Sequence, residues 1–273
     1  MKSSRRTFIK NFSIASAWLL GGGIQPLTAA EVLSLKNKVV FRFAVASDGH
    51  YGQANTSFDD FFSQITNHIN LFHRQSPLHG CVINGDIIHD KQDFLLQAKQ
   101  KLDHLSMPYF VTKGNHDMVS DNYWKEVWGV AANYEKVFKK NTFLMLTTSN
   151  EKGEYLSPDL TWLETRLDEH KSQKNIFLFI HIPQYKWTAN AIDTPAFFEL
   201  VKKYSNIKSV FHGHEHDQDG VKLMDNIPYI FDSHFGGNWG TSYRGFRVVE
   251  VMKDNTMITY IMNPSEKMNE TSH

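Results

Sequence analysis

Val111-Thr112-Lys113-Gly114-Asn115-His116-Asp117 gives the first indication of how this chain folds. The stretch begins with β-branched residues, which favour a buried strand, and continues with Gly114 and Asn115, which favour a tight turn. The turn presents an amide, an imidazole and a carboxylate in succession. Taken alone, it is compatible with an ordinary polar turn, so the interpretation depends on whether similar stretches occur elsewhere.

Four further polar stretches also follow apolar runs. They are Asp48-Gly49-His50, Gly85-Asp86, His181-Ile182-Pro183 and Gly213-His214-Glu215-His216. A spacing of two puts both members of a pair on the same side of an extended chain. Strand ends are held rigidly while the loops beyond them are free to carry function. Five such stretches in order therefore predict a site for two metal ions rather than five unrelated turns.

The candidate metal ligands are carboxylates, imidazoles and one amide. They are Asp48, His50, Asp86, Asn115, His181, His214 and His216. This mixed set suits Mn, Fe, Zn or Ni better than Ca²⁺. The set contains no thiolate, which argues against a structural zinc site. The predicted cofactors are two divalent or trivalent metal ions, and the sequence leaves their identity open.

Composition and charge are those of a soluble globular protein. The chain has 273 residues, of which 41% are hydrophobic and 21% charged, and its formal net charge is zero. No basic patch suggests a nucleic-acid surface. Cys81 is the only cysteine, so no internal disulfide can form, and its apolar neighbours indicate a small core residue. The oligomeric state is left open.

Residues 1–30 are predicted to be an export signal of the twin-arginine type. Arg5 and Arg6 precede an apolar stretch over residues 14–24, and Thr28-Ala29-Ala30 offers a small-residue cleavage site. The apolar stretch is shorter than the ~20 residues that span a bilayer. The predicted location is therefore the periplasm or another exported compartment, with export machinery as a partner. An uncleaved signal that anchors the protein to the membrane remains an alternative.

The chain after the signal alternates between strand-like and helix-like segments. Residues 38–264 are interpreted as one α/β domain with two sheets, and residues 265–273 as a polar tail. Expected strands cover residues 39–47, 80–84, 109–112, 141–148, 175–180 and 207–211, followed by short strands from residue 221 onward. Expected helices cover residues 57–75, 94–105, 121–128, 157–169 and 194–204, with Ser157 as a helix cap.

Together the five stretches resemble the calcineurin-like metallophosphoesterase superfamily. The resemblance covers about residues 41–216 and extends to a plausible β tail. It implies a four-layer αββα sandwich in which two mixed β-sheets are flanked by helices. It also implies two ligand groups that share Asp86. The first metal is expected on Asp48, His50, Asp86 and His216, and the second on Asp86, Asn115, His181 and His214.

The same resemblance implies phosphoester hydrolysis by a metal-bound hydroxide that attacks phosphorus. His116 is spare in the ligand count and is expected to stabilise the phosphate or protonate the leaving group, with a role in orienting Asn115 as the alternative. Asp117 is a second candidate catalytic residue. Some relatives carry a supporting aspartate three residues after the bridging one. This chain has His89 there, so Asp90 and Asp117 are both candidate partners of His116.

The expected substrate is a small phosphate ester. A phosphodiesterase, acting for example on nucleotides or cyclic nucleotides, and a phosphomonoesterase are both consistent with the motifs. Aromatic residues in the loops over residues 183–195 and 232–244 offer surfaces for stacking on a base, although packing within the loops explains them equally well. Two other interpretations are a metal-bearing scaffold without catalysis and a hydrolase of lipid-linked or cell-wall phosphates.

Overall fold

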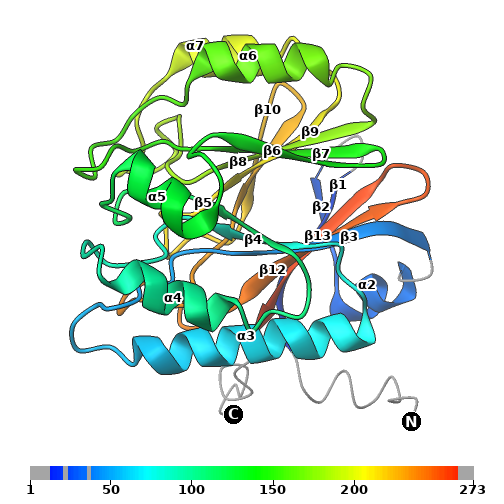
Figure 1. The fold of residues 1–273 in the computed structure, drawn as a ribbon. Helices are drawn as coiled ribbons and strands as arrows, with labels where there is room; N and C mark the ends of the chain where they lie inside the picture. Colours follow the sequence, from blue (N-terminus) through cyan, green and yellow to red (C-terminus); the bar gives the residue numbers. More distant parts are fainter. Residues whose placement is uncertain (1–12, 21–23, 36–37, 264–273) are drawn as a thin grey trace.

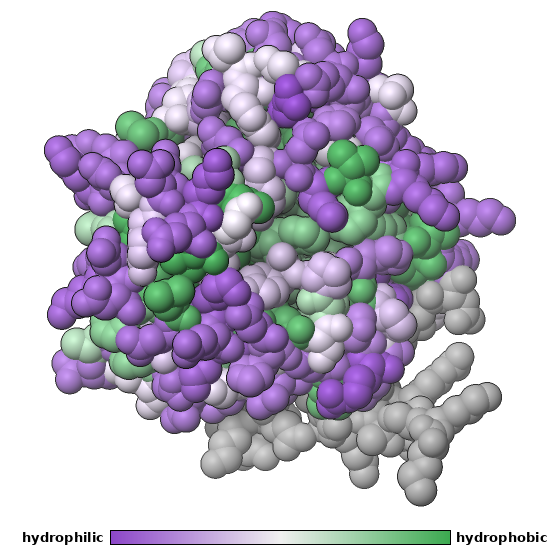
Figure 2. Space-filling model, viewed as in Figure 1, coloured by the Kyte–Doolittle hydropathy of each residue, from purple (hydrophilic) through white to green (hydrophobic). Residues whose placement is uncertain are grey.

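The computed structural model describes residues 13–20, 24–35 and 38–263. Two mixed β-sheets pack face to face, and helices cover both outer faces (Figure 1). This is the four-layer α/β arrangement that the resemblance implied, so the predicted fold class is confirmed. Hydrophilic residues cover most of the face shown in Figure 2, while apolar surface appears in the recess between the upper and lower layers.

The first sheet has seven strands with three parallel strands at one side. Its order is β2 (Ile24–Pro26), β1 (Ser13–Leu20), β13 (Met257–Asn263), β12 (Phe246–Met252), β3 (Val39–Ala46), β4 (Cys81–Asn84) and β5 (Tyr109–Thr112). β3, β4 and β5 run parallel, and the remaining neighbours pair antiparallel. The first three polar stretches therefore leave the same edge of this sheet.

The second sheet has six strands with a parallel centre. Its order is β10 (Val221–Met224), β11 (Ile227–Phe231), β9 (Ile207–His212), β8 (Asn175–Ile180), β7 (Asn141–Leu146) and β6 (Tyr134–Phe138). β11, β9, β8 and β7 run parallel, and β10 and β6 are antiparallel edge strands. The central strands β8 and β7 are buried along their whole length, as expected for parallel strands covered on both faces.

Amphipathic helices cover the outer faces. α3 (Phe58–Gln75), α4 (Phe94–Leu102) and α5 (Asp121–Trp128) pack into the apolar cluster of the first sheet, and α6 (Leu160–Glu169) and α7 (Pro195–Val201) into that of the second. In α3 the helical spacing predicted from sequence puts apolar residues on one buried face. Figure 1 shows α6 and α7 above the sheets and α3 and α4 below them.

An aromatic layer fills the space between the sheets. β3 alternates, so that Phe43 and Val45 face the second sheet while Ala44 and Ala46 face the helices. Phe43 meets the edge of Phe143 with ring centroids 4.8 Å apart. This packed layer fixes the two sheets to one another, and with them the strand ends that carry the polar stretches.

Two local features differ from the sequence prediction. α6 begins at Leu160 rather than near Ser157, because the carboxylate of Asp159 accepts a hydrogen bond from the Trp162 N–H at 3.0 Å and caps the helix. β6 was not predicted. Its residues are only partly buried or exposed, so the segment lacks the apolar signal of a core strand.

Part of the predicted export segment lies within the first sheet. β1 pairs antiparallel with β13, β2 pairs with β1, and α2 (Ala29–Leu35) follows. Leu20 is buried. The described fold therefore begins before residue 38, whereas residues 1–12 and the predicted tail over 265–273 lie outside the described residues. None of the helices in the described ranges is both long and apolar enough to cross a bilayer. Export itself stays a prediction.

Candidate metal centre

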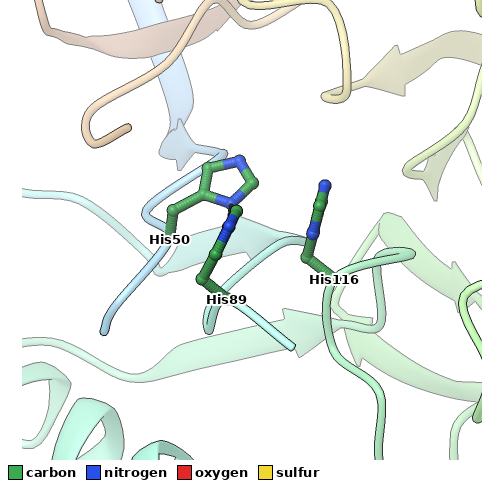
Figure 3. Close-up of side chains that lie close together, drawn as sticks. All are labelled: His50, His89 and His116. Carbon is green, nitrogen blue, oxygen red and sulfur yellow. Dashed lines mark hydrogen bonds between the residues drawn. The ribbon is translucent and has the colours of Figure 1, made fainter. Parts of the chain in front are cut away.

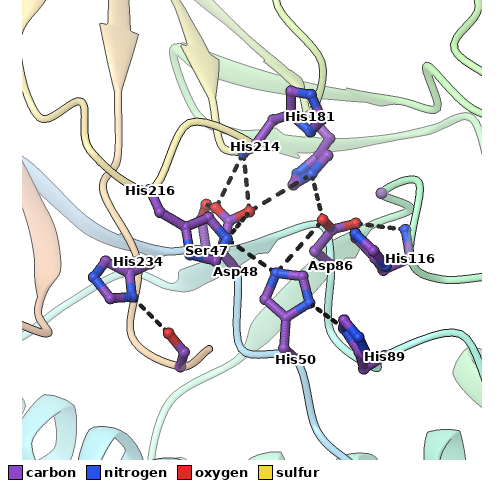
Figure 4. A network of polar contacts seen from close by, with 12 residues as sticks. Ser47, Asp48, His50, Asp86, His89, His116, His181, His214, His216 and His234 are labelled. Atoms are coloured by element: carbon purple, nitrogen blue, oxygen red, sulfur yellow. Dashed lines mark hydrogen bonds and ion pairs between the residues drawn. The ribbon is translucent and has the colours of Figure 1, made fainter. Parts of the chain in front are cut away.

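Five strand ends converge on one site between the sheets. The loops after β3 and β5 bring His50 and His116 close together (Figure 3). The loops after β8 and β9, from the other sheet, add His181, His214 and His216 (Figure 4). The structure thus brings the side chains of the predicted ligands together from both sheets.

The predicted ligands form two groups. Donor atoms of Asp48, His50 and His216 lie within 4.8 Å of one another, and so do those of Asp86, His181 and His214. Asp86 lies between the groups. Its Oδ2 atom is 3.1 Å from His181 Nε2 and 3.7 Å from His50 Nε2. The geometry therefore matches the bridging position that the resemblance gives to Asp86.

Two predicted ligand atoms, Asn115 Oδ1 and His214 Nε2, are buried without a hydrogen-bond partner among the described residues. Buried polar atoms are normally satisfied, so these two atoms call for a missing partner. In the first group, His50 Nε2 and His216 Nε2 lie only 2.9 Å apart. Oxygen and nitrogen donors arranged in this way fit metal cations.

Backbone carbonyls orient two of the imidazoles. Nδ1 of His181 lies 2.8 Å from the carbonyl oxygen of Asn84, and Nδ1 of His216 lies 3.2 Å from that of Trp239. A carbonyl only accepts, so Nδ1 carries the proton and Nε2 directs its lone pair to the centre. The tautomers therefore suit metal binding.

The electrostatics also favour cations. Burial raises the pKa of Asp48, but the nearby imidazoles of His181 and His216 lower it to about 2. Burial lowers the pKa of His181, but the carboxylates of Asp86 and Asp48 raise it to about 10. Burial lowers the pKa of His50 to about 3. The carboxylates are thus charged at neutral pH, and a metal ion replaces the proton that they otherwise hold on His181.

Four residues at the centre have an unusual backbone conformation. Asp48, His50, Asp86 and His214 all have left-handed backbone conformations, with φ between 48° and 70°. The N–H of His214 donates to Asp48 Oδ1 at 3.0 Å, and the N–H of His116 donates to Asp86 Oδ1 at 2.8 Å. Such conformations are costly for residues other than glycine and are typical of functional sites.

Among the residues that the structure describes, His116 has one carboxylate partner. Its Nδ1 lies 2.7 Å from Asp90 Oδ1, which settles the alternative between Asp90 and Asp117 in favour of Asp90. The side chain of His116 is 27% exposed, whereas those of His50, His181 and His216 are fully buried. With Nδ1 engaged by Asp90, Nε2 is the atom of His116 that remains for a substrate.

Asp117 joins the loops after β4 and β5. Its carboxylate is fully buried and accepts hydrogen bonds from the backbone N–H groups of Ile88 at 3.0 Å and Gly114 at 2.8 Å. Burial, and then the charge of Asp86, raise the pKa of Asp117 to about 7. These contacts indicate a role in holding the loops, and a catalytic role for Asp117 stays a prediction.

The structure adds residues that the sequence analysis did not assign. His89 Nδ1 lies 3.0 Å from His50 Nδ1, and the ring of His89 stacks on His116 with centroids 4.7 Å apart. Asn84 orients His181 through its carbonyl group, which no side-chain pattern could indicate. His89 stood out in the sequence only because it replaces the expected aspartate.

The aromatic loop residues divide into two kinds. Phe235 is buried against Phe62, and Trp187 packs against Tyr229. Trp239, by contrast, is 46% exposed and stacks on His216 with centroids 3.9 Å apart. Tyr155, outside the loops singled out in the sequence, is 39% exposed and meets His214 edge-on at 4.9 Å. One exposed aromatic ring therefore lies beside each of the two ligand groups.

Comparison with known proteins agrees with this geometry. The family model described as calcineurin-like phosphoesterase matches residues 41–218, and the chain belongs to this family. The family and the donor set identify the chain as a metal-dependent phosphoester hydrolase. No curated protein gives a significant match.

Several solved structures share the fold at low sequence identity. A dimetal phosphatase from Danio rerio has 15% identity and a TM-score of 0.68, with 84% of this chain and 98% of that chain covered. GAP50, the anchor in the inner membrane complex of Plasmodium, has 15% identity and a TM-score of 0.60, with 84% and 86% covered. A putative 5′-nucleotidase from Staphylococcus aureus has 15% identity and a TM-score of 0.55, with 82% of this chain but 54% of that chain covered.

Proposed function

We propose that this chain hydrolyses phosphodiesters, with nucleotide diesters such as cyclic nucleotides as the favoured class. One observation carries the proposal. Two groups of metal-ligating side chains share Asp86, and the partly exposed His116–Asp90 pair stands beside them. Bound metals would neutralise the phosphoryl charge and lower the pKa of a water molecule. The candidate ligands are those of the two groups, together with Asn115.

In this proposal His116 handles the leaving group. Asp90 holds the proton on Nδ1 and fixes the orientation of the ring, at 2.7 Å. Nε2 then donates a proton to the departing alkoxide oxygen, a step that commonly contributes 10²–10⁴-fold to the rate. His89, stacked on His116, limits the rotation of the ring.

The preference for diesters rests on charge. Three basic side chains in the surrounding loops are engaged elsewhere in the described structure. Lys113 pairs with Asp121 at 3.0 Å, Arg244 donates to the carbonyl oxygen of Gly237 at 2.8 Å, and Lys186 donates to that of Ala191. None of these three side chains is placed to meet the second negative charge of a monoester, whereas a diester carries one charge fewer.

The nucleotide preference rests on Trp239 and Tyr155. Both rings are exposed beside the ligand histidines. An exposed aromatic face can stack on a planar base, which contributes about 1–3 kcal/mol per base in proteins that bind single strands. The putative 5′-nucleotidase from Staphylococcus aureus shares the fold, which is consistent with recognition of a nucleotide but does not specify a diester.

The test compares substrates and separates catalysis from metal binding. The metal-free protein is reconstituted with Mn²⁺, Fe²⁺, Zn²⁺ or Ni²⁺ and assayed with bis(4-nitrophenyl) phosphate, 4-nitrophenyl phosphate, nucleotides and cyclic nucleotides. We expect diesters to be hydrolysed faster than monoesters. His116→Ala should lower kcat about 10²–10⁴-fold while the metal content by elemental analysis stays that of the wild type.

The second candidate function is that of a scaffold without catalysis. GAP50, which shares the fold, is described as an anchor. The exposed His116–Asp90 pair favours the enzyme, because a scaffold has no need of it. Absence of turnover with all four metals and all four substrate classes, in a protein that binds metal, would support the scaffold instead.

We also propose export, on the N-terminal sequence alone. The paired Arg5 and Arg6 and the apolar segment after them support it. Fractionation of cells that express the full chain, compared with an Arg5→Lys/Arg6→Lys variant, tests the proposal. We expect the variant to accumulate in the cytoplasm, and an equal distribution of the two proteins would contradict export by this route.

A further inference from the structure

A cavity opens between the sheets at the end opposite the metal centre. It lies where β3, β7 and β8 begin and where β12 ends, whereas the metal ligands follow the far ends of β3 and β8. Its volume is about 560 Å³, within the range of small-molecule sites. A second cavity of about 280 Å³ shares Lys174, Asn175 and Asn255 with it. We call the two together the basal pocket.

The wall of the larger cavity is largely apolar. Phe41 and Phe138 extend the aromatic layer between the sheets to this end, with ring centroids 5.2 Å apart. Val251 is buried beside them, and Val40 is 56% exposed at the rim. An opening into the inter-sheet core that is lined in this way fits an alkyl chain.

The rim of the basal pocket is basic. Lys139, Lys140, Lys174 and Lys253 line it and are exposed, and none of them forms an ion pair with another residue of the described ranges. No acidic residue is among those that line either cavity. Lys208 lines the smaller cavity; burial, followed by the charge of Lys174, lowers its pKa, while the nearby carboxylate of Asp254 raises it. The lysines at this mouth outnumber that one carboxylate, so the mouth carries net positive charge and is complementary to an anion.

A buried amide supplies the third feature. Asn175 is only 2% exposed and lines both cavities. Its Nδ2 donates to Asn141 Oδ1 at 2.9 Å and to Asn255 Oδ1 at 3.1 Å, but its Oδ1 has no hydrogen-bond partner within the described part of the chain. A buried acceptor in this position is available for a donor from a ligand that occupies the pocket.

We propose that the basal pocket binds a medium-chain carboxylate amphiphile that carries a hydroxyl group near its head. The alkyl chain lies against Phe41 and Phe138, the carboxylate lies among the rim lysines, and the hydroxyl donates to Asn175 Oδ1. The site is separate from the metal centre, so the proposal does not depend on the proposed function.

Calorimetric titration of the full chain tests the proposal below the critical micelle concentration of each probe. The probes are 3-hydroxydodecanoate, dodecanoate and dodecyltrimethylammonium. We expect saturable binding with one ligand per chain, tightest for the hydroxy acid and at least tenfold weaker for the cation. Equal affinity for anion and cation would overturn the proposal, as would the absence of saturable binding.

Matched variants locate the site. Lys140→Glu/Lys174→Glu should weaken binding of the hydroxy acid at least tenfold. Lys125→Glu/Lys152→Glu makes the same change of charge at exposed positions outside the pocket and should leave Kd within twofold. An equal loss of affinity in the two double variants would indicate general electrostatic attraction and contradict the assignment of the ligand to the basal pocket.

Two further variants test the predicted contacts of the ligand's alkyl chain and of its hydroxyl group. Val40→Trp at the exposed rim should obstruct the opening and weaken both carboxylates, with the fold monitored by circular dichroism. Asn175→Ala should remove the preference for 3-hydroxydodecanoate over dodecanoate. If the Asn175 variant does not fold, the same preference is tested in the wild type with 3-methoxydodecanoate, which lacks the donor, and an unchanged affinity would refute the role of Asn175.

Discussion

His89 connects a predicted metal ligand with the predicted catalytic histidine. It lies 3.0 Å from His50 through the Nδ1 atoms, and its ring is nearly parallel to that of His116, at 12°. Residues that hydrogen-bond to ligand histidines typically change metal affinity or activity 10–100-fold when they are replaced. We therefore infer that His89 positions both the predicted ligand His50 and the predicted catalytic residue His116.

For His89→Ala we expect metal affinity to fall about 10–100-fold and kcat to fall with it. His89→Asn should recover part of both, because an amide can still hydrogen-bond to His50. Competition with a chelator measures the affinity in the absence of substrate. His79→Ala, an exposed histidine in the basal pocket, is the control, and a loss of affinity equal to that of His89→Ala would count against the positioning role.

Gly114 is required by the close approach of two loops. A Cβ atom at this position would lie 2.2 Å from Asp86 Oδ1 and 2.3 Å from its backbone nitrogen. We expect Gly114→Ala to displace Asp86 and reduce both metal content and activity at least tenfold. Gly220→Ala is the matched control, since a Cβ there would meet nothing within 4 Å. Wild-type metal content in Gly114→Ala would show that the loops can separate without cost.

The sequence placed its candidate ligands in the loops that begin at strand ends. All seven lie in such loops, and the structure places six of them in two compact groups. The partner of His116 could not be predicted in the same way. Asp90 reaches it because its own backbone is left-handed, with φ of 67°, whereas the adjacent Asp117 turns inward to bind backbone N–H groups. The sequence therefore left both carboxylates open as partners of His116, and only the folded backbone distinguishes them.

At the level of elements, β1 covers an edge that would otherwise be exposed. It pairs along β13 from Ser13 to Leu20, and β2 then covers β1. An uncovered β13 would present free backbone donors and acceptors, which favour pairing with another chain. Removal of the predicted export segment would therefore uncover β13 at the edge of the first sheet.

We expect a chain that begins at residue 31 to unfold at a lower temperature than one that begins at residue 13, or to self-associate. Thermal unfolding and size-exclusion chromatography at several protein concentrations measure the two effects. The shorter chain also lacks β2, so a Leu20→Asp variant of the longer chain tests the packing of β1 by itself. Equal melting temperatures and monomeric behaviour for all three proteins would show that β1 contributes nothing to the fold.

Element boundaries could be predicted where the apolar pattern was strong. The strands at 109–112 and 175–180 and the helix at 121–128 agree residue by residue with the structure. β6 could not be found, because a partly exposed edge strand is stabilised by its partner β7 rather than by its own composition. The strand β1 was not expected, because the apolar stretch after Arg5 and Arg6 also fits an export signal, and export itself stays a prediction.

For the whole molecule, the metal centre joins the two sheets. Asp48, Asp86 and Asn115 come from loops of the first sheet, and His181, His214 and His216 from loops of the second. A metal bound by both sheets in the folded state alone stabilises the fold by about 2.7 kcal/mol at a concentration 100 times its Kd.

We therefore expect chelation to lower the melting temperature of the protein by several degrees and metal to restore it. His116→Ala should show the same shift as the wild type, because His116 is not among the predicted ligands. Asp86→Asn should show a smaller shift, because Asp86 lies between the two groups. Scanning calorimetry with and without added Mn²⁺ makes the comparison. An identical response of Asp86→Asn and the wild type would exclude Asp86 as a ligand.

The separation of the ligands along the chain has a consequence for biosynthesis. His50 and His216 are 166 residues apart, yet their Nε2 atoms face one another across 2.9 Å. A ribosome that has released only the amino-terminal half of the polypeptide has made neither ligand group in full, because His181, His214 and His216 all come later. Tight capture of metal must therefore wait until translation has passed residue 216, so that a loaded ion marks a polypeptide whose two halves have both been made and joined.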